Sequence, residues 1–195
     1  MWDIQVLSFN EEQIRDVYGR FLVRDFPQDE VKPLSMILKA RREGKYVCFG
    51  AYDREELLAY AFFVILPREG KSVYLFDYLA VLPQNRGKGV GSAFLQALMA
   101  HPLQDAECVL LEIDHPDFGL TVEEREKRLR RQHFYLKNGL LDTGVQANVY
   151  GVEFKILELP IGPGHPRDWV RDMYSKLYAA ILPPAVFDAR VKVRP

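Results

Sequence analysis

The chain has 195 residues, of which 48% are hydrophobic and 27% charged, a composition typical of a globular domain that buries a core without crosslinks. Its 26 Lys and Arg side chains nearly balance 27 Asp and Glu side chains, so we expect neither nucleic acid nor an anionic membrane as a partner. The sequence has no apolar run of membrane-spanning length and no signal-peptide pattern, and a cytoplasmic location is therefore expected.

The first half of the chain predicts two helices followed by three strands. Residues 10–26 place apolar side chains at helical spacing behind Asn10, and residues 32–44 form a shorter helix that opens near Pro33 and ends at Gly44. The strands are expected at residues 45–53, 57–66 and 72–82.

The second half alternates helices with strands. A helix that starts at the capping box of Thr121 and Glu124 should end at Gly139. The other elements are expected as a helix at 92–100, a strand at 108–114, a strand at 149–159, a helix at 165–182 and a strand or tail at 183–195. This order predicts an α/β (α+β) fold with a mixed sheet and helices on both faces.

Cysteine and histidine give no sign of a metal centre. Cys48 and Cys108 lie in apolar strand-like runs, and we expect both to be buried, unpaired thiols. A catalytic thiol is the alternative, which the lack of a nearby histidine in the sequence disfavours. The four histidines follow no metal-ligand spacing, and no metal is expected.

The segment Tyr78–Leu98, YLAVLPQNRGKGVGSAFLQAL, runs from a strand through three glycines into a helix. A helix N-terminus offers free N–H groups and a positive dipole end, and glycines let an anion approach the backbone closely. The P-loop pattern fails here because the glycines are too close together and Lys88 lies between them. A dinucleotide or S-adenosylmethionine site is an alternative, although Ser92 stands where the third glycine of that fingerprint belongs.

The loop also resembles the signature of the GNAT superfamily of acyl-CoA-dependent N-acetyltransferases. Gln84-Asn85-Arg86-Gly87-Lys88-Gly89 matches its pattern Q/R-x-x-G-x-G/A. The segment His133–Gly139, HFYLKNG, is similar to the second signature of that family, with Leu140 where an aromatic residue is commoner. The resemblance covers residues 45 to 158 and implies one GNAT domain over 1–160, with a C-terminal appendage over 161–195 packed on it.

The resemblance implies a mostly antiparallel central sheet with a splayed strand pair that holds acyl-CoA. The pantetheine arm would lie along the strand residues Leu79, Ala80 and Val81. The pyrophosphate would be held by the loop and first helical turn, namely Gln84, Arg86, Gly87, Lys88, Gly89, Val90, Gly91 and Ser92.

The resemblance also places the proton donor for the leaving thiolate at Tyr135, and the alternative is that this side chain only packs or hydrogen-bonds the thioester sulfur. The general base is open at this stage. Asp77 interrupts an apolar strand on the side of Leu79 and Val81, and a structural carboxylate is the alternative for it. Glu112 and Asp114 on the next strand are the other candidates, although Asp114 could equally lie in the loop after that strand.

The expected activity is transfer of an acetyl group from acetyl-CoA to a primary amine by direct attack, with a small-molecule amine favoured as acceptor. A non-catalytic module that binds or senses acyl-CoA is the alternative. Asp25, Asp29 and Glu30 could favour a cationic amine, although a solvated acidic loop explains them as well. A homodimer paired through the C-terminal region is a further expectation.

Overall fold

The computed structural model of the chain describes residues 2–28 and 30–194. It divides into two compact units, and the first consists of Met1–Ile65 with Asp77–Gln104. The second consists of Leu66–Phe76 with Asp105–Pro195. Strand β4 (Lys71–Val81) passes from the second unit into the first.

The first helix of the first unit starts where its cap predicts. Asn10 accepts the N–H of Gln13 and the Gln13 side chain accepts the N–H of Asn10, which closes a capping box before α1. A π-helical turn follows directly, so that residues 11–25 form one continuous helical stretch. The helices of this unit are α1 (Glu11–Val17), α2 (Val23–Asp25), α3 (Leu34–Arg42) and α4 (Val90–Ala100).

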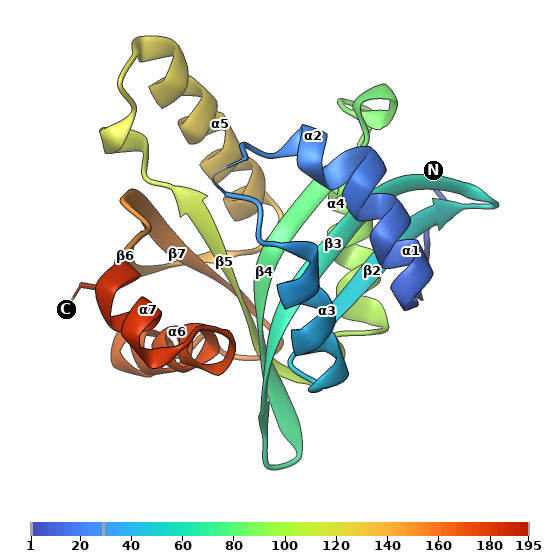
Figure 1. The fold of residues 1–195 in the computed structure, drawn as a ribbon. Coiled ribbons are helices and arrows are strands. Elements are labelled where there is room, and N and C mark those ends of the chain that lie inside the picture. Colours follow the sequence, from blue (N-terminus) through green and yellow to red (C-terminus); the bar gives the residue numbers. More distant parts are fainter. Residues whose placement is uncertain (1, 29, 195) are drawn as a thin grey trace. The chain divides into compact units, whose positions relative to one another are not determined.

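An antiparallel ladder forms the sheet of the first unit. β1 (Gln5–Ser8) pairs with β2 (Tyr46–Asp53), which pairs with β3 (Glu56–Arg68). In Figure 1, α1 and α3 lie over one face of these strands and α4 lies behind them. The three strands expected in this half are confirmed, but β1 was not predicted, because its four largely exposed residues show no apolar alternation.

The second unit has the strand order β4-β5-β7-β6-β8. Among the described pairs within each unit, only β4 and β5 run parallel, from Ser72 to Phe76 of β4. The class is therefore α/β with a mostly antiparallel sheet, as predicted. The strands other than β4 are β5 (Ala106–Asp114), β6 (Leu141–Val149), β7 (Val152–Pro160) and β8 (Val191–Val193).

The single strand expected at 149–159 is wrong. The chain turns at Tyr150 and Gly151, both of which have positive φ, and this turn separates β6 from β7 as a hairpin. Tyr150 is exposed at the tip of the turn. A non-glycine residue at positive φ is uncommon, and the apolar alternation that runs through it conceals the turn.

Three helices complete the second unit: α5 (Val122–Lys137), α6 (Arg167–Ile181) and α7 (Pro184–Arg190). Thr121 accepts the N–H of Glu124 as expected, but the Glu124 carboxylate accepts the N–H of Leu120 rather than that of Thr121. Residues expected as a strand or tail form both α7 and β8, and β8 pairs with β6. The predicted domain boundary at residue 160 stays a prediction.

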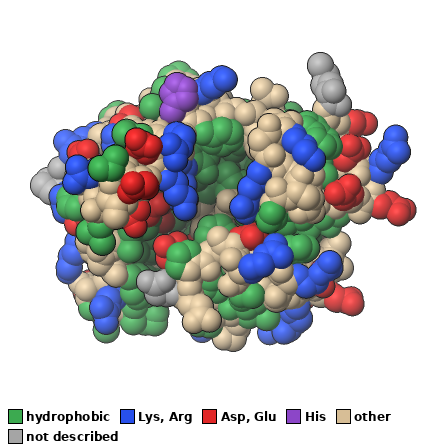
Figure 2. Space-filling view, turned by 90° about the horizontal axis from the view of Figure 1, so that it is seen from above, with side chains coloured by type: hydrophobic (Ala, Val, Ile, Leu, Met, Phe, Trp, Pro, Cys, Tyr) green, Lys and Arg blue, Asp and Glu red, His purple; other side chains and the backbone are tan. Residues whose placement is uncertain are grey.

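The interior is mostly apolar, with a few buried polar side chains such as Asn85 and Glu158. Cys48 and Cys108 are both buried and free, as expected. On the face drawn in Figure 2, Lys and Arg side chains lie among Asp and Glu side chains rather than in one field of a single sign. None of the helices in the described part of the chain is long and apolar enough to cross a membrane.

Candidate functional site

The glycine loop of the first unit has the backbone shape that its sequence predicts. After β4 and a short 3-10 turn at Pro83–Asn85, Gly87 and Gly89 adopt φ values of +74° and +81°. A Cβ added to either glycine would meet no atom within 4 Å, so it is the left-handed backbone, not crowding, that favours glycine here. Gly89 is the N-cap of α4, and Val90, Gly91 and Ser92 form its first turn. The backbone N–H groups of a first helical turn have no partner within the helix.

Two side chains, Arg86 and Trp2, brace this loop. The Nε of Arg86 donates to the carbonyl of Val81 at 2.9 Å, and its Nη2 lies 3.7 Å from the Asp25 carboxylate. The indole N–H of Trp2 donates to the carbonyl of Lys88 at 2.8 Å. The Arg86 side chain is thus turned back onto its own strand, while the Lys88 and Gln84 side chains are exposed.

The residues present fit an anionic ligand such as the pyrophosphate of acetyl-CoA. One short segment combines the N-terminus of α4, the glycine backbone and the exposed Lys88 side chain. The amide nitrogen of buried Asn85 in the same loop has no hydrogen-bond partner within the described part of the chain. Buried donors are nearly always satisfied, so this amide could donate to a ligand or water oxygen. The sequence did not predict Asn85 as a ligand-binding residue.

The strand residues before the loop vary in exposure. Ala80 is buried, whereas Leu79 and Val81 are half-buried on the other side of β4. Asp77 lies on that same side, as the two-residue period predicts. Leu79, Val81 and Asp77 therefore share one strand face within the first unit, whereas Ala80 lies on the other face.

Asp77 already has two partners. Its side chain is 4% exposed and forms an ion pair with Lys32, whose Nζ lies 2.5 Å from Oδ1. The Tyr46 hydroxyl donates to the other carboxylate oxygen. Burial, followed by the Asp77 charge, raises the pKa of Tyr46 well above its ordinary value, so this hydroxyl keeps its proton. The ammonium group next to Asp77 is thus supplied by the chain itself.

The segment between α2 and α3 is fastened to β4. The Tyr78 hydroxyl donates to the carbonyl of Glu30 and accepts the backbone N–H of Lys32. The Tyr18 hydroxyl donates to the carbonyl of Lys32 at 3.1 Å. The sequence did not predict these hydrogen bonds, because an aromatic residue within an apolar run is usually a core residue.

The acidic residues expected in a solvated loop behave differently from one another. The side chain of Asp25 is only 4% exposed and accepts the Tyr60 hydroxyl at 3.0 Å, so for this residue the solvated interpretation is wrong. Glu30 is exposed, and Asp29 lies outside the described residues.

An open cavity of about 570 Å³ lies in the first unit between α1 and the β2–β3 turn. Its charged lining has four carboxylates against one arginine, namely Glu12, Asp16, Glu55, Glu56 and Arg20. Leu82 and Gln84 also line it. The excess of negative charge suits a cation rather than a phosphate.

Tyr135 belongs to the second unit, at the end of α5. It is 8% exposed, and its ring packs edge-on against Phe134. Burial raises the pKa of Tyr135 to about 12, although the nearby Arg131 opposes this rise. The phenol therefore keeps its proton at neutral pH, as a proton donor must.

Glu112 of β5 is bound by two phenols of α6. The hydroxyls of Tyr174 and Tyr178 both donate to the same Glu112 oxygen, the second at 2.7 Å. Burial, and then the Glu112 charge, raise the pKa of Tyr174 well above its ordinary value. Two residues further on, Asp114 lies in β5 and pairs with Arg131 at 2.8 Å. Both carboxylates thus have partners in the second unit.

Comparison with known protein families gives one match that covers part of the chain. Residues 44–139 match the family model described as an acetyltransferase (GNAT) domain. No curated protein sequence matches the chain.

Solved structures share the fold at low sequence identity. A GNAT-family protein from Bacteroides thetaiotaomicron has a TM-score of 0.66 at 16% identity, covering 90% of this chain and 96% of its own. The ribosomal-protein-S18-alanine N-acetyltransferase of Escherichia coli has a TM-score of 0.59 at 16% identity, with coverage of 83% and 96%. Spermidine N-acetyltransferase from Vibrio cholerae, solved with CoA and spermine, has a TM-score of 0.57 at 12% identity, with coverage of 80% and 94%.

Both predicted signatures, the glycine loop and the segment around Tyr135, fall inside the matched range. Residues 44–139 therefore match a GNAT acetyltransferase domain, and the chain shares its fold with solved GNAT-family structures.

Proposed function

We propose that the protein is an N-acetyltransferase that moves an acetyl group from acetyl-CoA to a primary amine of a small molecule by direct attack. The observation that carries this proposal is the pair of left-handed glycines at the N-terminus of α4, inside a segment that matches the GNAT family. An αL pair there opens the backbone N–H groups to an anion, and a bare strand-to-helix turn has no need of it.

Acetyl-CoA would supply the thioester that is attacked. Around it, the first-turn N–H groups of Val90, Gly91 and Ser92 would bind phosphate oxygens, with Lys88 adding positive charge. The backbone of Leu79, Ala80 and Val81 would hold the pantetheine arm. Arg86 would act chiefly as a brace, because its guanidinium already contacts Val81 and Asp25.

Two proton transfers complete the reaction. The amine must lose a proton to attack the carbonyl, and Asp77 and Glu112 are the candidate acceptors. The thiolate must gain a proton, and the Tyr135 phenol is the proposed donor because a phenol is protonated at neutral pH and this one lies in the segment that resembles the second GNAT signature. Tyr135→Phe should lower kcat at least about tenfold and leave KM for acetyl-CoA unchanged, since it removes a proton rather than a binding contact.

The first experiment is calorimetric titration with acetyl-CoA, set beside S-adenosylmethionine and NAD. Saturable binding of acetyl-CoA alone, abolished in Gly89→Arg, is the expected result. Binding of either rival instead would overturn the assignment of the loop.

The second experiment measures CoA release over a panel of amines. The acidic cavity beside Gln84 and the spermidine-acetylating neighbour are reasons to include polyamines, and the alanine-acetylating neighbour is a reason to include a peptide with N-terminal alanine. Asp77→Asn and Glu112→Gln are then compared by their pH–rate profiles, because loss of the true base removes the acidic limb. Acetyl-CoA binding without product on any amine would favour the sensing module instead.

A further inference from the structure

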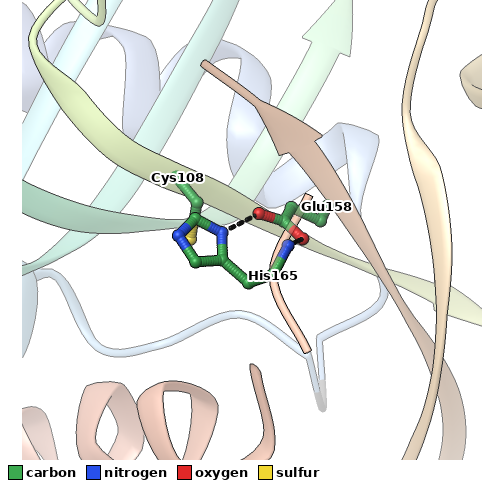
Figure 3. A group of neighbouring side chains, drawn as sticks. All are labelled: Cys108, Glu158 and His165. Carbon is green, nitrogen blue, oxygen red and sulfur yellow. Dashed lines mark hydrogen bonds and ion pairs between the residues drawn. The ribbon is translucent and has the colours of Figure 1, made fainter. Parts of the chain in front are cut away.

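Three side chains of the second unit that no part of the proposed reaction uses lie together. They are Cys108 of β5, Glu158 of β7 and His165, which precedes α6. One potential ligand atom from each lies within 4.8 Å of the other two, as Figure 3 illustrates. They are 50 and 7 residues apart in the chain, so no local spacing in the sequence reveals the group.

The sheet register explains why they meet. β5 and β7 run antiparallel, and Glu158 pairs with Leu110, two residues beyond Cys108. Cys108 and Leu110 point to the same face of β5, so Glu158 is a diagonal neighbour of Cys108 on that face. The chain then returns over this face, and the backbone N–H of His165 donates to the Glu158 carboxylate at 3.0 Å.

The imidazole of His165 is held on two sides. Its Nδ1 contacts the other oxygen of Glu158, and the Trp169 ring stacks on it with centroids 3.8 Å apart and planes 16° from parallel. Figure 3 shows the second ring nitrogen turned toward Cys108. A histidine whose one ring nitrogen is fixed by a carboxylate presents the other nitrogen in a defined direction, which is the usual arrangement of metal-bound histidines.

We propose that Cys108, Glu158 and His165 form a binding site for Zn²⁺. Sulfur and imidazole nitrogen are the donors that zinc prefers, whereas Mg²⁺ and Ca²⁺ select sites made of oxygen alone. Cys108 and Glu158 are 0% and 1% exposed, and a buried ion must have its charge balanced. Thiolate and carboxylate together carry two negative charges, which offset the two positive charges of the ion.

Binding exchanges the Cys108 S–H bond for a sulfur–zinc bond, and the released proton goes to solvent. Water supplies the remaining coordination position, which is reached from the side of His165, the most exposed of the three residues. A metal here would join β5, β7 and the start of α6. The site is therefore structural and independent of whether the protein transfers acetyl groups.

Cys48 provides a matched control within the same chain. It is as fully buried as Cys108 and lies in a β-strand, and burial raises the pKa of both thiols. In the described part of the chain, the cluster at Cys108 is the one group of three or more metal-ligating side chains at this spacing, and Cys48 is not a member.

The test is titration of the full-length, chelator-treated protein with Co²⁺, which reports thiolate ligation by a sulfur-to-metal charge-transfer band. Wild-type protein and Cys48→Ala should bind one equivalent with this band, which Zn²⁺ displaces. Cys108→Ala should lose the band, and Glu158→Gln should bind at least about tenfold more weakly. Zinc should also raise the Tm of wild-type protein but not that of His165→Gln.

A wild-type protein without the band, or a band lost in Cys48→Ala and kept in Cys108→Ala, would overturn the proposal. The wild-type spectrum decides whether any cysteine binds the metal, so a folding failure of Cys108→Ala leaves the test intact. In that case His165→Gln, which alters a side chain near the surface, locates the site. If only the Tm of the variants falls and no metal binds, Glu158 and His165 form a structural ion pair and the zinc site is wrong.

Discussion

The indole N–H of Trp2 donates to the carbonyl of Lys88, 86 residues further along the chain, at 2.8 Å. Trp2, which precedes β1, is thus attached to the middle of the glycine loop. Because this carbonyl lies between Gly87 and Gly89, the bond restrains the segment whose backbone is otherwise the most permissive in the loop.

Trp2→Phe should therefore weaken acetyl-CoA binding by about two- to tenfold, since a neutral hydrogen bond contributes about 0.5–1.5 kcal/mol. Calorimetric titration measures the change. The chain has two tryptophans, so Trp169→Phe serves as the control and leaves Trp2 as the only indole fluorophore. An unchanged affinity in Trp2→Phe would mean that the loop holds its shape without this brace.

Gly87→Ala and Gly89→Ala should each reduce acetyl-CoA affinity at least about tenfold. Left-handed backbone costs a residue with a Cβ about 1–2 kcal/mol, and the loop can relieve that strain by abandoning its shape. Gly70→Ala is the matched control, because Gly70 has φ +75° and open space around its Cβ position, but lies in the turn between β3 and β4. Gly70→Ala should lower the Tm by about as much as Gly87→Ala and Gly89→Ala do, and it should leave the affinity for acetyl-CoA unchanged. Equal losses of affinity in all three variants would contradict the role of the loop.

The Lys32–Asp77 pair should contribute more to stability than exposed ion pairs do. A double-mutant cycle with Lys32→Met and Asp77→Asn is expected to give a coupling energy of more than about 1 kcal/mol, because the two side chains are only 19% and 4% exposed. The pair Asp16–Arg20, which is 53% and 66% exposed, should give about 0.3–0.5 kcal/mol. Urea unfolding of the variants in both cycles gives the two coupling energies. Similar values would show that the Asp77 pair is solvated in solution.

Alkaline pH should destabilise the protein from about pH 10 upward. Burial raises the pKa of Tyr46, Tyr60, Tyr78, Tyr135 and Tyr174 above the ordinary value of about 10. Below pH 10 these phenols are protonated in both the folded and the unfolded chain, so they do not make stability depend on pH.

Above pH 10 the unfolded chain releases protons that the folded chain still holds. The free energy of unfolding then falls by about 1.4 kcal/mol per pH unit for each such tyrosine, up to its folded pKa, which is about 12 for Tyr135. Absorbance of phenolate at 295 nm should rise in two phases, exposed tyrosines first and buried ones together with loss of the circular dichroism of the fold. A single phase that precedes unfolding would be the contrary result.

The sequence predicted those features that depend on local chemistry. The capped helix at Asn10, the glycine loop and the end of α5 just before Gly139 were all expected, because caps and left-handed glycines leave residue-type signals at fixed offsets. β1 and the turn at Tyr150 were missed. β1 forms because it pairs with β2, which lies far away in the sequence. Tyr150 adopts a positive φ although its residue type does not favour one.

Partners from distant segments could not be predicted either. Lys32 and Tyr46 lie 45 and 31 residues from Asp77, and the sequence has no pattern that pairs them. The same holds for the two tyrosines of α6 that bind Glu112. Such contacts follow from the strand order and from the return of the chain over the sheet, which periodicity within one element does not encode.

The short strand β8 has a consequence for self-association. Its residues Val191–Val193 pair with β6 and so occupy N–H and C=O groups that an open sheet edge would present to another chain. Its ladder has three residue pairs, and the backbone N–H of Arg194 donates to Gln146 beside them. A second copy of the same segment carries the same donors and acceptors. Concentrated protein is thus expected to exchange C-terminal segments between copies, and a chain ended at Arg190 to aggregate through the exposed edge of β6.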